Sequence, residues 1–112
     1  MHKKISRWVK DKQQGIKRAL VTAYDYPTAR FAAAAGMHGV LVGDSLGMVV
    51  CGDHDTLSVT LEQMCYHTRM VRRGAGGCLV FADLPFGTYE KSPEQAWESA
   101  GELLRAGADV IK

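Results

Sequence analysis

Polar residues follow four apolar segments of this sequence, at the points where buried strands would end. Asp25 comes after ALVTAY, Asp44 and Ser45 come after VLVG, Asp83 comes after CLVFA, and Lys112 comes after ADVI. An unpaired carboxylate at the end of a buried strand is costly, so each aspartate needs a partner or a function. In a parallel α/β fold the carboxyl ends of all strands lie on one face of the sheet, so these side chains are expected to converge.

These residue types suit a hard cation beside an anionic small molecule. Magnesium is usually held by one or two carboxylates, and Asp44 and Asp83 are the best candidates because no closely spaced cysteine or histidine pair is present. Lys112 on the same face would bind an anionic group, so the predicted ligand is a small oxygen-rich acid. The alternative is that each aspartate only caps a helix or tightens a turn, and Asp25 is the member that this alternative fits best.

The segments that carry these residues alternate between strand and helix patterns. Near-continuous apolar runs predict four parallel strands covered on both faces, at residues 19–24, 40–43, 78–82 and 108–112. Helices are expected after Pro27, from Thr60 to about Gly74 and from Ser92 to about Gly107, and an amphipathic helix is expected over about residues 5–14. The segment Leu46–Val59 is longer than most such linkers and is interpreted as a lid or binding loop.

This order favours a single domain, residues 1–112, that is either a doubly wound sheet or part of a (β/α)8 barrel. A complete barrel takes about 250 residues, so length alone favours the doubly wound sheet. The chain nevertheless stops inside its fourth strand, at Lys112, without a helix to cover that strand. The N-terminal half of a barrel, preceded by a short helix, explains this pattern better.

Composition excludes several classes of function. A formal net charge of +2 gives no electrostatic case for nucleic acid, and no apolar run approaches the roughly 20 residues of a membrane-spanning helix. The N-terminus has charge but no apolar stretch typical of a secretory signal. Cys51, Cys65 and Cys78 form no C-x-x-C pair, and we expect a cytoplasmic protein.

The motifs together resemble the 3-methyl-2-oxobutanoate hydroxymethyltransferase (ketopantoate hydroxymethyltransferase) family. The resemblance is carried by TAYDYPTARFAAAAG, VLVGDSLGMVV, YHTRMVRRG, ADLPFGTY, SPEQA and RAGADVIK, in that order from about Ile5 to Lys112. It implies a barrel of the phosphoenolpyruvate/pyruvate type, usually a decamer. It also implies transfer of a hydroxymethyl group from 5,10-methylenetetrahydrofolate to 3-methyl-2-oxobutanoate, giving 2-dehydropantoate for pantothenate and coenzyme A synthesis.

The resemblance also implies roles for individual residues. Magnesium-binding aspartates of the family match Asp44 and Asp83, and its oxo-acid contacts match Asp44, Ser45, Asp83 and Lys112. The metal would stabilise an enolate of the oxo acid. The family's general base is a glutamate expected beyond Lys112, so the 112 residues alone are expected to be inactive.

Two other functions remain open from the sequence. Magnesium-dependent oxo-acid lyases and mutases of the isocitrate lyase type use similar barrels without folate. A truncated, non-catalytic product that self-associates through the exposed edge strand ADVIK is the other, because an open strand edge favours association.

Overall fold

The computed structural model describes residues 3–112. Helices and strands follow one another as α1 (Lys3–Gln13), β1 (Leu20–Thr22), α2 (Tyr26–Ala34), β2 (Gly39–Val42), α3 (Leu46–Val49), α4 (Leu61–Gly74), β3 (Leu79–Ala82), α5 (Pro93–Ala106) and β4 (Val110–Ile111). The expected strands and helices are therefore present. Three strands are one to three residues shorter than expected, whereas β2 has the expected length and is shifted by one residue toward the N-terminus.

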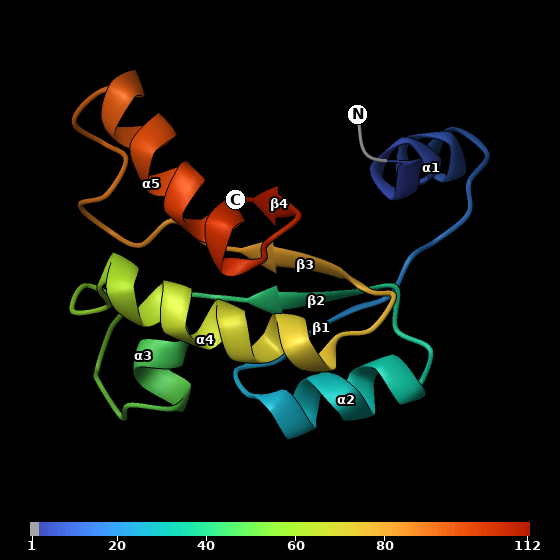
Figure 1. The fold of residues 1–112 in the computed structure, drawn as a ribbon, viewed down its shortest axis with the longest axis horizontal. Helices are drawn as coiled ribbons and strands as arrows, with labels where there is room; N and C mark the ends of the chain where they lie inside the picture. The colour runs from blue at the N-terminus through green and yellow to red at the C-terminus, as the bar shows by residue number, and fades with distance from the viewer. Residues whose placement is uncertain (1–2) are drawn as a thin grey trace.

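The four strands form one parallel sheet in the order β1-β2-β3-β4. Helix α4 packs on β2 and β3 and lies between α2 and α5, and α5 packs on β4 (Figure 1). Parallel strands joined in sequential order by right-handed crossovers carry all their helices on one face of the sheet. A doubly wound sheet would carry helices on both faces, so this arrangement is that of successive β/α units of a barrel.

Local sequence signals explain where the long helices begin and end. The hydroxyl of Thr60 accepts from the backbone N–H of Gln63, and the Gln63 side chain accepts from the N–H of Thr60, which completes a capping box for α4. The hydroxyl of Ser92 accepts from the backbone N–H of Gln95 and caps α5, ahead of a proline in the first turn. At the other end, Gly107 adopts φ +115°, a left-handed conformation that stops α5.

The core lies between the sheet and the row of helices. Side chains of β2 and β3 that point toward the helices are fully buried, and they meet buried residues of α4 and α5. The main members of this core are Val40, Val42, Val80, Ala82, Met64, Val71 and Leu103. This packing fixes the carboxyl ends of β2 and β3, where the polar residues begin.

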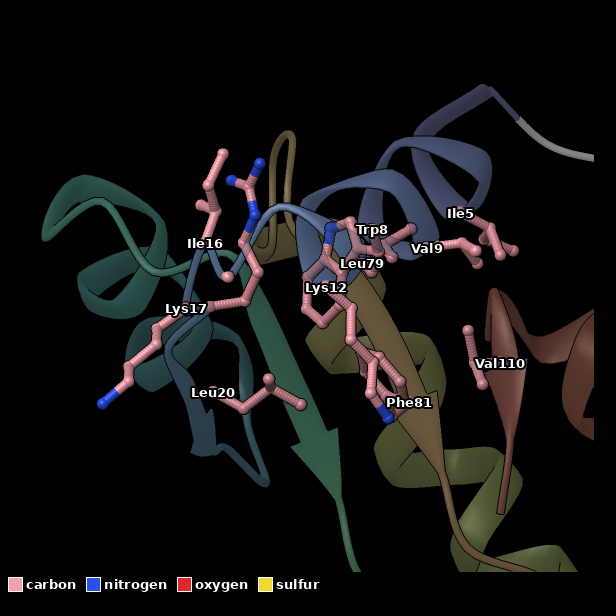
Figure 2. A pocket seen from close by; sticks show the side chains of 12 residues that line it. Ile5, Trp8, Val9, Lys12, Ile16, Lys17, Leu20, Leu79, Phe81 and Val110 are labelled. Atoms are coloured by element: carbon pink, nitrogen blue, oxygen red, sulfur yellow. The ribbon is translucent and has the colours of Figure 1, made fainter.

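The opposite face of the sheet forms an apolar groove with α1 (Figure 2). The groove has a volume of about 650 Å³, and its sheet wall consists of Leu20, Leu79, Phe81 and Val110. The rings of Trp8 in α1 and Phe81 lie 5.5 Å apart between centroids. In a closed (β/α)8 barrel this face of the sheet is the packed interior. Self-association through the β4 edge stays a prediction.

The segment Leu46–Val59 differs from the expected loop. It begins with the four-residue helix α3, which the sequence did not indicate because so short a helix shows no apolar periodicity. The remainder consists of turns, bends and irregular backbone, and His54 is exposed in a bend. Over residues 3–112, every helix is too short or too polar to span a membrane.

Candidate active site

Three of the predicted polar residues, Asp44, Asp83 and Lys112, line one pocket at the carboxyl ends of β2, β3 and β4, whereas Ser45 follows Asp44 but is not among the lining residues. The pocket has a volume of about 340 Å³ and is lined by Asp44, Asp83, Leu84, Tyr89 and Lys112. It lies at the opposite end of the strands from the larger apolar groove. The smaller pocket is the candidate active site because it gathers two carboxylates and an ammonium group at the carboxyl ends of neighbouring parallel strands.

Asp83 is the centre of this site. It is only 7% exposed, and both of its carboxylate oxygens accept hydrogen bonds. Oδ1 accepts from Nζ of Lys112 at 2.8 Å, and Oδ2 accepts from the backbone N–H of Asp44 at 3.1 Å. The register of the sheet produces this arrangement, because Ala82 pairs with Ile111 and the next residues are Asp83 and Lys112.

Lys112 keeps its positive charge at this position. Its side chain is 67% exposed, and the hydrogen bond to Asp83 is the main cause of a pKa raised above the ordinary lysine value. The negative charges of Asp83 and then Asp44 raise this pKa further, while partial burial opposes them. The ammonium group is therefore available to an anionic ligand across the neutral pH range.

Gly43 allows the backbone to pass close to the site. A Cβ atom added there would lie 3.2 Å from Oγ of Ser45 and 3.3 Å from Oδ2 of Asp83. Both distances are shorter than ordinary van der Waals contact, so a larger residue would displace the two side chains. The glycine that precedes Asp44 is thus a spatial requirement of the site.

Ser45 makes a contact that sequence reasoning missed. It occupies the N-cap position of α3, but its hydroxyl makes no capping bond and instead lies 2.7 Å from the hydroxyl of Tyr24. Tyr24 follows β1 and is half-buried. Nδ1 of His67, in α4, lies 2.6 Å from the backbone carbonyl of Tyr24. The only sequence signal for Tyr24 was its place at the end of ALVTAY.

Asp25 lies outside this cluster. Its Oδ1 accepts from the backbone N–H of Thr28 at 2.9 Å and caps α2, as the capping interpretation predicted. Hydrogen bonding by Thr28, first through its side chain and then through its backbone N–H, is the main cause of a lowered pKa for the exposed Asp25 carboxylate, and nearby His67 contributes a smaller part. Of the three aspartates at strand ends, Asp25 has a structural role.

The loop after β3 supplies the remaining wall of the pocket, which the sequence did not identify. Leu84 and Tyr89 lie on it and add apolar surface beside the charged groups. Hydrogen bonds fix the loop: the hydroxyl of Ser99 donates to the carbonyl of Thr88 at 2.6 Å, and the amide of Gln95 donates to the carbonyl of Gly87 at 2.8 Å. An acid with an apolar branch would find both a charged and an apolar wall here.

The donor set fits a hard divalent cation. Asp44 and Asp83 offer carboxylate oxygens in one pocket, and the residues that the structure describes contain no cluster of three histidine, cysteine or acidic side chains able to hold a metal. Magnesium commonly takes one or two protein carboxylates and fills its other positions with water or substrate oxygens. Two carboxylates next to open space meet that requirement.

Comparison with known proteins identifies relatives along the whole chain. Residues 2–112 match the family model described as ketopantoate hydroxymethyltransferase. The 3-methyl-2-oxobutanoate hydroxymethyltransferase of Acidithiobacillus ferrooxidans is 78% identical over 112 residues, which are 100% of this chain and 43% of that protein. The chain therefore spans less than half the length of this curated relative.

Solved structures confirm the fold prediction. A 2,3-dimethylmalate lyase, a member of the PEP mutase/isocitrate lyase superfamily, superposes with a TM-score of 0.71 at 20% identity, over 99% of this chain and 39% of that one. Phosphonopyruvate hydrolase in complex with oxalate and Mg²⁺ gives a TM-score of 0.78 at 14% identity, over 98% of this chain and 38% of that one. At these identities the likeness shows the fold, which is the N-terminal part of a (β/α)8 barrel.

Proposed function

The chain belongs to the ketopantoate hydroxymethyltransferase family, and on that premise we propose that it carries the oxo-acid and magnesium site of such an enzyme. The reaction is transfer of a hydroxymethyl group from 5,10-methylenetetrahydrofolate to 3-methyl-2-oxobutanoate, giving 2-dehydropantoate for pantothenate synthesis. The observation that carries the proposal is the buried Asp83 carboxylate, which is linked to Lys112 and to the backbone of Asp44 within one pocket.

The polar residues that line the pocket, and Ser45 next to Asp44, each have a part in holding the acid. Asp44 and Asp83 would hold the magnesium ion, which suits a 2-oxo acid because its carboxylate and keto oxygen are also hard donors. Lys112 pairs with the negative charge of the acid, and the hydroxyl of Ser45 donates to one of its oxygens. Leu84 and Tyr89 provide the apolar wall for the branched carbon chain.

The site favours removal of a proton from C3 of the acid. Lewis-acid stabilisation of the negative charge on the keto oxygen is the chemistry that magnesium supplies when bound. The C3 proton goes to a base that we assign to a glutamate outside residues 1–112. C3 then forms a bond to the one-carbon unit of the folate, tetrahydrofolate leaves, and water provides the oxygen of the new hydroxyl group.

The test uses an enzyme completed by joining these 112 residues to the part of the A. ferrooxidans relative that they do not match. We expect this completed enzyme to form 2-dehydropantoate, to require both the folate and Mg²⁺, and to lose activity when EDTA removes the metal. Asp44→Ala should abolish turnover. A completed enzyme that folds but converts 3-methyl-2-oxobutanoate without folate, or not at all, would refute the proposal.

The lyase alternative has weaker support. The two solved structures described above share the fold at 14% and 20% identity, whereas the transferase relative is 78% identical over all 112 residues of this chain. Omission of the folate from the assay separates the two activities directly.

A further inference from the structure

We propose that Tyr24 is a positioning residue that orients the Ser45 hydroxyl to donate a hydrogen bond to the bound oxo acid. This inference deepens the proposed function and rests on it. It starts from the 2.7 Å contact between the two hydroxyl oxygens, which joins the carboxyl end of β1 to that of β2. Over residues 3–112, Ser45 makes no other side-chain hydrogen bond, and in particular it does not cap α3.

The direction of this hydrogen bond follows from the chemistry of the two groups. A phenol is a stronger hydrogen-bond donor than an aliphatic alcohol because its pKa is much lower, near 10 for tyrosine. Each hydroxyl has a single proton to donate, whereas the serine oxygen has two lone pairs to accept. When Tyr24 donates to Oγ of Ser45, the serine proton is left for an acceptor on the ligand. Oγ of Ser45 and Oδ2 of Asp83 both lie within 3.4 Å of a Cβ added at Gly43, so the serine hydroxyl lies near the carboxylate at the centre of the site.

An anionic acid is such an acceptor. In the chain Tyr24 O–H to Ser45 O–H to ligand oxygen, each hydrogen bond polarises the next, and the bond to an ionised oxygen is the strongest of the series. Without the tyrosine hydroxyl, the serine could rotate and accept rather than donate. Tyr24 therefore selects ligands that present a carboxylate or keto oxygen to Ser45.

Contacts with His67 and with the core fix the position of Tyr24. A backbone carbonyl can only accept, so Nδ1 of His67 must carry the proton in its 2.6 Å contact with the Tyr24 carbonyl. The Tyr24 ring is half-buried and packs against the core. On the other side of Ser45, Gly43 leaves only enough room for the serine oxygen. These contacts restrict the tyrosine hydroxyl to the position from which it reaches Ser45.

The experiment is a double-mutant cycle in the completed enzyme, with Tyr24→Phe, Ser45→Ala and both together. Binding of 3-methyl-2-oxobutanoate in the presence of Mg²⁺ is measured by calorimetry, and KM and kcat by turnover. Tyr24→Phe should weaken acid binding about five- to tenfold, as loss of one hydrogen bond in a charged network does, and leave the Mg²⁺ affinity within about twofold. In the Ser45→Ala background, Tyr24→Phe should have no further effect on acid binding.

Tyr26→Phe is the matched control. It removes a hydroxyl that accepts from Arg30 at 3.0 Å on α2, away from the pocket, and should leave acid binding unchanged. Equal effects of Tyr24→Phe with and without Ser45, or a parallel loss of Mg²⁺ affinity, would overturn the positioning role while leaving the proposed function intact. A native completed enzyme that does not bind the acid would overturn both.

Discussion

Replacement of Asp83 by asparagine separates a role in the site from a role in the fold. The side chain stays the same size, but one acceptor oxygen becomes an NH₂ donor. Because Asp83 accepts from both Lys112 and the N–H of Asp44, the amide can satisfy only one of these donors and must oppose the other. The substitution therefore removes a charge and breaks one hydrogen bond without creating a cavity.

The expected cost to the fold is modest. Lys112 is 67% exposed and regains water when its partner is lost, so that ion pair contributes about 0–1 kcal/mol. A remaining unmade bond at the 7% exposed Asp83 adds about 1 kcal/mol. The total is about 1–2 kcal/mol of unfolding free energy. Each kcal/mol lowers the Tm by about 2–4 °C in a protein the size of the completed enzyme.

The expected cost to the metal site is much larger. Loss of a group that only orients a metal ligand typically weakens metal binding about 10–100-fold, and loss of a ligand should exceed that range. We expect the Mg²⁺ affinity of Asp83→Asn, measured by calorimetry in the completed enzyme, to fall by at least about 100-fold. Turnover at low Mg²⁺ should fall with it.

Asp25→Asn is the matched control for this prediction. It removes a carboxylate at the end of β1, but asparagine caps helices as well as aspartate does, so α2 should persist. Mg²⁺ affinity should not change. If Asp83→Asn binds Mg²⁺ within about threefold of Asp25→Asn, Asp83 is not a metal ligand. If Asp83→Asn fails to fold, the Asp83 carboxylate is required for the fold, and the small loss of stability that we expect is wrong.

Three further substitutions test neighbouring features. Lys112→Met should raise KM for the oxo acid at least about tenfold without weakening Mg²⁺ binding, because it removes the cation that pairs with the acid. Since the Lys112 pKa is raised above 10.5, deprotonation of this group should cause no loss of native turnover below about pH 10. A loss at lower pH that Lys112→Met abolishes would contradict this expectation. Asp25→Ala should lower the free energy of unfolding in urea by about 1 kcal/mol at pH 7. Because the folded-state pKa of Asp25 is lowered, the stabilisation by its carboxylate is present above pH 3.8 and should disappear as the pH falls through the lower folded-state pKa. A stability difference between native protein and variant that persists at pH 2 would argue against capping by the carboxylate. Gly107→Ala should destabilise the protein by about 1–2 kcal/mol in a thermal melt, because φ is +115° and the new Cβ would lie 2.6 Å from Cγ of Arg72. Gly101→Ala, inside α5, is the control and should be neutral or stabilising in the same measurement.

Sequence patterns predicted the residues whose placement depends on topology alone. Asp44, Asp83 and Lys112 meet because parallel strands in sequential order bring their carboxyl ends to one rim, whatever the surrounding side chains are. The capping motifs at Thr60 and Ser92 were also readable, because they involve residues only three positions apart.

The features that the sequence missed depend on side-chain direction or on very short elements. Whether Tyr24 points at Ser45 or at solvent is decided by its rotamer, which core packing and His67 restrict only in the folded chain. Helix α3 has one turn and presents no repeat to detect. Tyr89 lines the pocket because a hydrogen bond from Ser99 in α5 to the carbonyl of Thr88 fixes its loop. The two bonded residues are 11 positions apart, so no local sequence pattern predicts the contact.

The observed bonds also explain why the site spans the whole sheet. At the carboxyl ends of the strands, a side-chain bond crosses each junction between neighbours: Tyr24 to Ser45 between β1 and β2, Asp44 N–H to Asp83 between β2 and β3, and Asp83 to Lys112 between β3 and β4. Because Asp44 and Ser45 are adjacent residues, these bonds form a continuous network along the rim. Hydrogen bonds in such a network strengthen one another, so the position of each group depends on its neighbours. A substitution in this network should therefore disturb ligand binding more than the same loss of a bond at an isolated surface position, such as Tyr26, and the fold itself should persist because its core lies beneath the rim.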